Sequence, residues 1–129
     1  MIEAWKMAEE KKRNGCNYDY YLWLNDDTFI YKDCIASLLR VSLLKKNRTI
    51  VLGSTVDTQT RSKLTYGGRD KTGKVARPSS DDSPVPVIMM NGNIVLVPHS
   101  VYKKLGTLDP YYTHARGDFD YGCAPVKLE

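Results

Sequence analysis

Residues 20–27 read Tyr-Tyr-Leu-Trp-Leu-Asn-Asp-Asp, and this stretch decides the fold. Five aromatic and aliphatic residues in a row indicate a short buried strand, because a buried helix would need about ten residues or more. The strand ends in Asn25, Asp26 and Asp27. Carboxylates crowded at the end of a buried strand repel each other and lose hydration, and a divalent cation commonly compensates them. A turn or a helix cap would explain the same residues without a ligand.

The segments around this strand alternate between helical and extended patterns. Residues 2–13 have the apolar spacing of a helix that stops at Asn14-Gly15, residues 33–47 predict a second helix, and residues 49–54 predict a second strand. The order helix, strand, helix, strand favours neighbouring parallel strands joined by right-handed crossovers. We therefore expect an α/β domain with a mixed sheet flanked by helices.

The second half of the chain is less regular. Residues 63–76 predict a small inserted β-hairpin, and residues 87–97 predict two apolar strands separated by Asn91-Gly92-Asn93. Residues 101–105 predict a short helix capped by Ser100, and residues 108–123 an irregular aromatic and acidic segment. Gly92 would let a ligand approach the backbone closely, although a tight turn explains it equally well.

Residues 117–122 read Gly-Asp-Phe-Asp-Tyr-Gly and form a second acidic motif. In an extended stretch alternate residues face the same side, so Asp118 and Asp120 would share a site. One could act as a general base while the other orients it or neighbours a metal, and a polar turn is the simpler explanation. Either histidine, His99 or His114, could touch phosphate or metal, although a lone histidine beside tyrosines is more often a packing residue; His114 stays a candidate.

Composition limits the function classes. A chain of 129 residues with 42% hydrophobic and 26% charged residues is typical of one small globular domain. The net charge of +4 is spread along the chain and forms no single basic stripe, so nucleic acid is not indicated. Three cysteines without a Cys-x-x-Cys pair argue against a zinc site or a disulfide framework and fit a reducing cytosol.

Together these motifs resemble a known family. Residues 20–28 and the helix after them resemble the metal-site segment of family-2 inverting glycosyltransferases. Tyr66-Gly67-Gly68 resembles a hairpin of their rhamnosyltransferase-like members, residues 90–109 resemble the acceptor-side strand and helix, and residues 117–122 resemble the segment that carries the catalytic base. The four motifs follow the family's order and approximate spacing over residues 18–122.

The resemblance implies a GT-A type, Rossmann-like fold and a bacterial-type enzyme of polysaccharide biosynthesis. Such an enzyme transfers a sugar from a nucleotide-sugar donor to a glycan or lipid-linked acceptor with inversion. By the resemblance, Asp27, with Asp26 beside it, would hold Mg²⁺ or Mn²⁺ against the donor diphosphate. Asn25 stands where the family's signature has its first acid, which lowers the expected metal affinity, and we expect it to contact substrate.

The resemblance also assigns the remaining site residues. Asp118 would deprotonate the acceptor hydroxyl, and Asp120 would support it. Gly92 and Asn93 would line the donor-sugar and acceptor side.

The chain departs from the family at both ends. The strand and acidic Ser/Thr-rich segment that hold the nucleotide in the family are missing ahead of residue 2, and residues 123–127 replace an Arg-containing helix. We therefore expect residues 1–127 to be a single partial catalytic domain, inactive alone, and residues 128–129 to be a tag remnant. The missing strand would leave residues 18–24 with an unpaired edge, which favours a homo-oligomer through that edge.

The expected location is cytoplasmic, or peripheral at the inner face of the membrane. No signal peptide and no apolar run of about 20 residues is present in the sequence. Two other functions stay open. One is a non-catalytic carbohydrate- or nucleotide-binding module, and the other is a sugar nucleotidyltransferase, which would normally carry a Gly-rich phosphate loop near the start.

Overall fold

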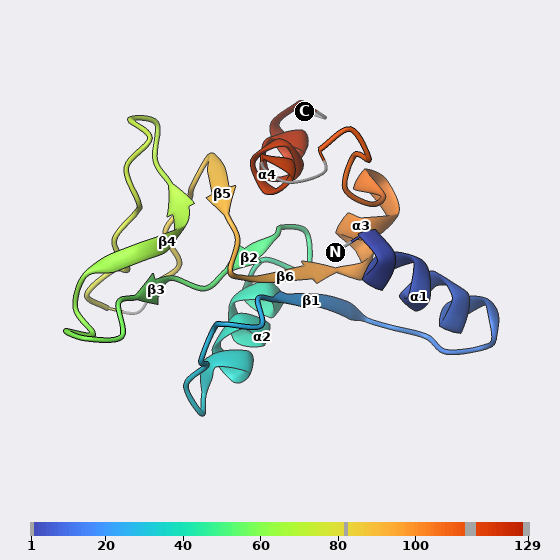
Figure 1. The fold of residues 1–129 in the computed structure, drawn as a ribbon, viewed down its shortest axis with the longest axis horizontal. Coiled ribbons are helices and arrows are strands. Elements are labelled where there is room, and N and C mark those ends of the chain that lie inside the picture. The colour runs from blue at the N-terminus through green and yellow to red at the C-terminus, as the bar shows by residue number, and fades with distance from the viewer. Residues whose placement is uncertain (1, 82, 113–115, 128–129) are drawn as a thin grey trace.

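A computed structural model describes residues 2–81, 83–112 and 116–127 (Figure 1). Within these residues the chain forms helices and strands in the order α1 (Ile2–Arg13), β1 (Tyr20–Leu24), α2 (Cys34–Leu44), β2 (Val51–Leu52), β3 (Thr55–Val56), β4 (Leu64–Arg69), β5 (Met89–Asn91), β6 (Ile94–Pro98), α3 (His99–Leu105) and α4 (Gly117–Lys127). The protein is thus mixed α/β. Its described strands form two small antiparallel sheets.

Strand β6 is the centre of the first sheet, whose order is β1-β6-β2. All five of its residues are buried, as expected for a strand that is apolar on both faces. It pairs antiparallel with both neighbours, so that Leu96 lies opposite Leu22 on one side and Val51 on the other. The prediction of neighbouring parallel strands is therefore wrong. β1 and β2 do run in the same direction, but β6 lies between them.

The second sheet has the order β3-β4-β5, and β4 forms the first arm of the predicted hairpin, whose second arm at residues 73–76 is not a strand of this sheet. The hairpin closes where Arg69 bridges Val75. The Asp70 carboxylate holds its turn by accepting hydrogen bonds from the amides of Thr72 and Lys74 at 2.8 and 3.1 Å. Asn91-Gly92-Asn93 ends β5 and leads into β6, so this break carries the chain from one sheet to the other.

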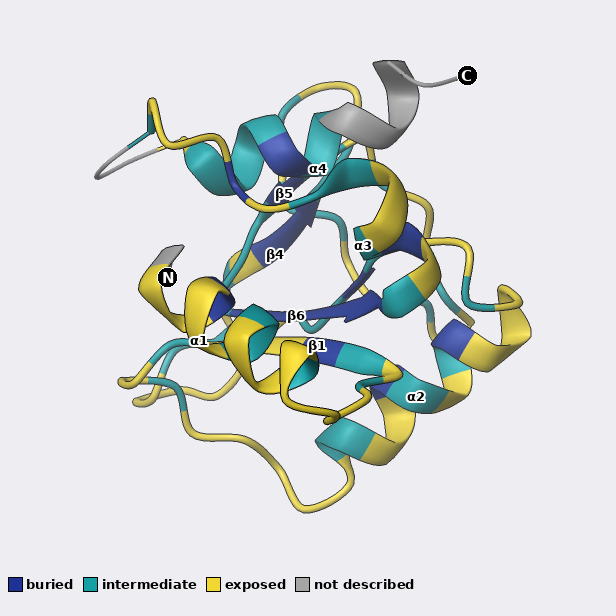
Figure 2. Cartoon of the chain, turned by 90° about the vertical axis from the view of Figure 1, so that its right-hand side faces the viewer, coloured by how far each residue is buried: buried dark blue, intermediate teal, exposed yellow. Residues whose placement is uncertain are grey.

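Alternating side chains of β6 divide the core into two clusters. Val95 and Val97 pack with Trp5, Trp23 and other residues under α1, α3 and α4, whereas Ile94 and Leu96 pack with Leu38 of α2. Helix α2 therefore covers one face of the sheet and the other three helices cover the opposite face, as Figures 1 and 2 show. Within the described residues, none of the helices combines the length and the apolar composition that crossing a membrane requires.

The helices confirm two predictions and correct two others. Helix α1 has the predicted bounds and stops before Gly15, whose φ is +94°. Helix α2 buries Leu38 on the predicted stripe, although it ends at Leu44 and not at Asn47 as predicted. Helix α3 begins earlier than predicted, and the Ser100 hydroxyl does not cap it but donates to the carbonyl of Asn47. The end of the chain is not irregular, because residues 117–127 form helix α4.

Candidate functional site

The candidate site begins where β1 ends. Because β1 and β6 are antiparallel, the end of β1 meets the start of β6, and two further hydrogen bonds join Asn25 to Asn93 there. The Asn25 amide N donates to the Asn93 carbonyl at 3.0 Å, and Asn25 Nδ2 donates to Asn93 Oδ1 at 2.8 Å. Two residues that are 68 apart in sequence are thereby fixed to each other, and both are half-buried.

Asp118 reaches the same place from α4. The amide N of Gly92 donates to Asp118 Oδ2 at 3.1 Å, and the amide N of Phe119 donates to Oδ1 at 2.9 Å. Asp118 lies in the first turn of α4, where the unpaired amides and the helix dipole favour a negative side chain. Since Gly92 precedes Asn93, the carboxylate is one residue away from the Asn25–Asn93 pair. Four residues predicted for the site are therefore brought together: Asn25, Gly92, Asn93 and Asp118.

The position of Asp118 depends on how closely α4 approaches β5. Gly122 lies one helical turn after Asp118, and a Cβ on it would lie 2.5 Å from Met90 Cγ. The Tyr121 hydroxyl donates to the Gly106 carbonyl at 2.9 Å, and its ring packs on Trp23 with 5.1 Å between centroids. Burial raises the pKa of Tyr121, so this hydroxyl stays protonated as a donor. These contacts hold the start of α4 beside Gly92.

Gly92 has a packing reason to be glycine. A Cβ at this position would lie 2.5 Å from Val95 Cγ2. Its amide N is also the donor that holds Asp118, a contact that the sequence did not predict. Alternation of polar and apolar residues cannot show such a contact, because it joins a backbone group to a side chain 26 residues away.

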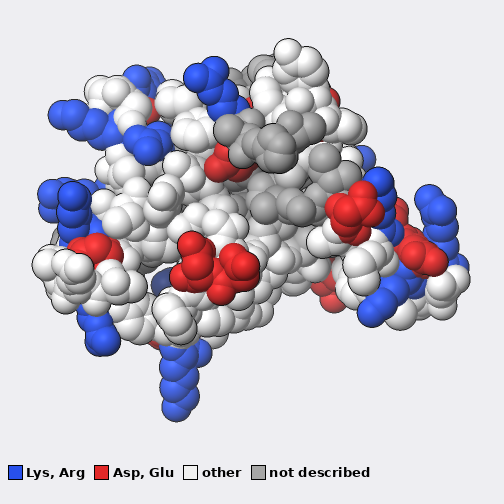
Figure 3. Space-filling model, viewed as in Figure 1, with Lys and Arg blue, Asp and Glu red and all other residues white. Residues whose placement is uncertain are grey.

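Asp26 and Asp27 lie in the exposed turn that follows Asn25. The amide N of Thr28 donates to the Asn25 carbonyl at 3.1 Å and closes this turn. Figure 3 shows acidic side chains gathered near the middle of one face of the molecule. The two carboxylates are accessible to water and to a ligand.

The donor set at this turn suits a hard cation in part. Mg²⁺ and Mn²⁺ take oxygen ligands, and Mg²⁺ sites often use only one or two carboxylates plus phosphate oxygens and waters. Two exposed carboxylates beside an amide side chain fit that pattern. Among the residues that the structure describes, no group of three or more His, Cys, Asp or Glu is placed to hold a metal ion. A phosphate ligand would have to complete the coordination.

Asp120 does not share the side of the chain on which Asp118 lies. The two would face the same way in an extended strand, but in α4 they are about 200° apart around the helix axis. The predicted extended arrangement of the two carboxylates is therefore wrong, and the amide N of Asp120 donates to the Arg116 carbonyl at 2.9 Å as part of the helix start. His114 lies outside the described residues.

A groove runs from the candidate site along the outer side of β1. It has a volume of about 710 Å³ and lies between β1 and one side of α1. Asn25 and Asp26 line it beyond the end of β1, and Lys11 of α1 also lines it. Its wall is mainly aromatic and aliphatic, with Trp5 and Trp23 among the lining residues.

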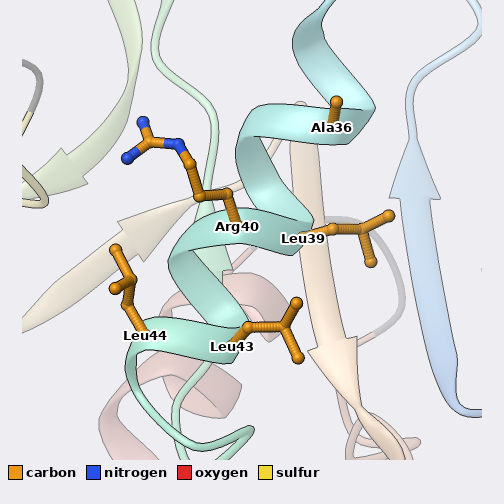
Figure 4. Close-up of a pocket in the computed structure, with 5 residues that line it drawn as sticks. All are labelled: Ala36, Leu39, Arg40, Leu43 and Leu44. Carbon is orange, nitrogen blue, oxygen red and sulfur yellow. The ribbon is translucent and has the colours of Figure 1, made fainter.

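A second depression, of about 570 Å³, lies on the outer face of α2 (Figure 4). Ala36, Leu39, Arg40, Leu43 and Leu44 line it, with no acid among them. All five residues come from α2 alone. We therefore place the candidate site at the end of β1 and not on this helix.

Comparison with known proteins assigns no further role to these residues. No family model, no curated protein and no solved structure matches the chain. Asn25, Asn93, Gly92 and Asp118, with Asp26 and Asp27 in the adjoining turn, are therefore the residues on which a function of this site depends.

Proposed function

We propose that this chain is part of a metal-assisted inverting glycosyltransferase with a GT-A type domain. Its donor is a nucleotide sugar, and its acceptor is a hydroxyl of a glycan or of a lipid-linked glycan. One observation carries the proposal: the two acidic motifs, far apart in sequence, meet at one end of the sheet through Gly92 and Asn93. A glycosyl transfer with inversion needs a base on one side of the anomeric carbon and charge compensation for the leaving diphosphate on the other.

Asp118 is the proposed base. Each of its oxygens accepts one amide hydrogen bond, from Gly92 and from Phe119, which fixes the carboxylate and leaves a further lone pair on each oxygen. The carboxylate takes the proton of the acceptor hydroxyl as the acceptor oxygen forms its bond to the anomeric carbon. The bond from that carbon to the diphosphate oxygen breaks, and the diphosphate leaves with the electron pair. The products are the inverted glycoside and a nucleoside diphosphate.

Asp27 and Asp26 are the proposed metal ligands, since both are exposed beside Asn25. A bound Mg²⁺ or Mn²⁺ would act as a Lewis acid toward the departing diphosphate. Asn25 Nδ2 is engaged by Asn93, so the Oδ1 of Asn25 and the Nδ2 of Asn93 are the amide atoms left to meet substrate. This pair would orient the donor sugar by hydrogen bonds.

The metal part of the proposal is tested with Mn²⁺ itself. Paramagnetic broadening in a ¹H–¹⁵N spectrum should be strongest at the amides of residues 25–28 and 92–93. Asp27→Asn should weaken Mn²⁺ binding by about tenfold or more, because one of few carboxylate ligands is lost. Asp19→Asn is the matched control, since Asp19 is also exposed but precedes β1 rather than following it. Broadening centred elsewhere would contradict the assignment.

The catalytic part is tested by release of nucleoside diphosphate from a panel of nucleotide sugars with Mn²⁺. In protein that shows turnover, Asp118→Asn should lower kcat by about 10²–10⁴ while Mn²⁺ affinity stays unchanged. Asparagine keeps an oxygen that can accept from Gly92, so the fold is preserved. Unchanged turnover in this variant would overturn the role of Asp118. Protein that binds nucleotide sugars tightly but never releases diphosphate would point instead to a binding module.

A further inference from the structure

Within the described residues, no strand pairs with the outer edge of β1, and this edge lacks the usual protection. β1 lies at the edge of its sheet and reads Tyr-Tyr-Leu-Trp-Leu, without the charges, prolines or bulges that shield edge strands from pairing with another chain. Leu22 and Leu24 are 40% and 43% exposed beside this edge. The groove of about 710 Å³ runs along the same strand. An apolar strand with a free edge next to a groove is suited to receiving another strand.

The hydrogen bonds at both ends of β1 show which backbone groups face outward. The His99 amide N donates to the Asp19 carbonyl, and the Asn25 amide N donates to the Asn93 carbonyl. Residues 19, 21, 23 and 25 therefore face β6, because hydrogen-bonded and non-bonded pairs alternate in an antiparallel ladder. Tyr20, Leu22 and Leu24 consequently direct their N–H and C=O groups to the open edge.

We propose that β1 of a second copy of this chain pairs antiparallel with this edge. A two-fold axis at Leu22 places Leu22 opposite Leu22 of the second copy, and Tyr20 opposite Leu24 in both directions. Each of these three outward-facing residues then exchanges two hydrogen bonds with its opposite residue. The pairing is closed and isologous, so it joins the two sheets into one and leaves no β1 edge for a third copy.

Side chains and charges favour this antiparallel pairing. Leu22 and Leu24 lie on the face of β1 opposite the buried Tyr21 and Trp23, and self-pairing sets them against Leu22 and Tyr20 of the second copy. In Figure 1 the chain turns back from the end of α1 into β1. Lys11 lies in the last turn of α1 and Asp26 follows the end of β1, so the two residues line opposite ends of the groove. Antiparallel pairing brings Lys11 of each copy toward Asp26 of the other. A parallel pairing would place like charges together.

The proposal is tested by sedimentation velocity over micromolar to near-millimolar concentrations. We expect a monomer–dimer equilibrium. Leu22→Lys should raise the dimer dissociation constant by about tenfold or more, because two lysines meet at the two-fold axis. Leu44→Lys is the matched control, since Leu44 is also exposed, at 61%, but lies on α2 away from β1. It should leave the equilibrium unchanged, and circular dichroism should show that both variants fold.

A cross-linking experiment tests the register without relying on a charged variant. Directly opposite, hydrogen-bonded residues have Cα atoms about 5.5 Å apart, which is within disulfide range. Leu22→Cys should therefore form a covalent dimer under mild oxidation, much faster than Leu44→Cys or the parent chain. Three outcomes would each overturn the proposal: a parent chain that stays monomeric at all concentrations, a dimer that survives Leu22→Lys, and equal cross-linking at positions 22 and 44.

Discussion

The contact between Gly122 and Met90 makes a quantitative prediction that links packing to the candidate site. In Gly122→Ala the new Cβ would lie 2.5 Å from Met90 Cγ and 3.1 Å from Met90 N. Carbon atoms in contact are normally about 3.5–4.0 Å apart, so α4 has to move away from β5 by about 1 Å. The hydrogen bond from Gly92 to Asp118 is already 3.1 Å long and would break with such a shift.

The expected net effect on stability is moderate because two effects oppose each other. Overpacking a tight contact costs about 1–3 kcal/mol, while alanine in place of a helical glycine returns about 1 kcal/mol. The free energy of unfolding in urea should fall by about 1–2 kcal/mol. The ¹H–¹⁵N signal of Gly92 should move at the same time, since its amide loses the Asp118 carboxylate.

A double-mutant cycle separates this clash from other causes. Met90→Ala removes the Cγ that the new methyl group meets, and the methyl group partly fills the space that Met90 leaves. The double variant should therefore be less destabilised than the sum of the two single variants by about 1 kcal/mol. Additive effects within about 0.3 kcal/mol, or a Gly92 signal that stays in place in Gly122→Ala, would refute the reasoning.

Two further predictions concern the sheet end and the aromatic core. Asn25→Ala should lower the free energy of unfolding by about 1 kcal/mol, because Asn93 Oδ1 loses its donor. Asn17→Ala is the control, because Asn17 is exposed, and it should change the free energy of unfolding little. Equal urea midpoints in the two variants would contradict the stabilising role of the Asn25–Asn93 pair. Burial lowers the pKa of His99, and the nearby charges of Lys12 and Lys103 lower it further. The unfolded state therefore binds a proton more readily than the folded state. The free energy of unfolding should consequently fall as the pH drops below about 6.5. His99→Phe should flatten the urea midpoint between pH 6.5 and 5.5, whereas Asp57 and Asp70, whose carboxylate pKa values hydrogen bonds lower, should contribute losses only at more acidic pH.

Local chemistry in the sequence predicted most elements but not their neighbours in space. The run at residues 20–24 and the stop at Gly15 are local signals, and both are confirmed. The place of β6 between β1 and β2 is not local, because it depends on which strand can be buried on both faces. Helix α4 was missed because two glycines and a proline lower its helix propensity. Packing of Gly122 on Met90 and the hydrogen bonds of the Asp118 carboxylate in the first turn compensate for that deficit.

In the candidate site, too, the sequence predicted individual residues better than their contacts with distant segments. Asp26, Asp27 and Asp118 were chosen as candidates from their residue types and from the motifs in which they stand, which the sequence shows directly. The expected extended backbone at residues 117–122 is wrong, because these residues begin α4, so alternation along a strand does not place Asp118 and Asp120 on one side. The contact that does hold Asp118 comes from the Gly92 amide, and only the tertiary structure reveals it.

Strand β1 serves both proposals, yet the two can be separated experimentally. Its end carries the acidic turn, while its side carries the open edge and the groove. Leu22→Lys acts at the middle of the edge and should remove the dimer while Mn²⁺ still binds at the turn. Asp27 does not line the groove, so Asp27→Asn should weaken Mn²⁺ binding without changing the dimer. If either substitution abolished both dimerisation and Mn²⁺ binding, the dimer contact and the metal turn would be one interdependent site. Lys11 and Asp26 would then not form a purely electrostatic contact between copies, and both copies would instead coordinate the metal at the turn.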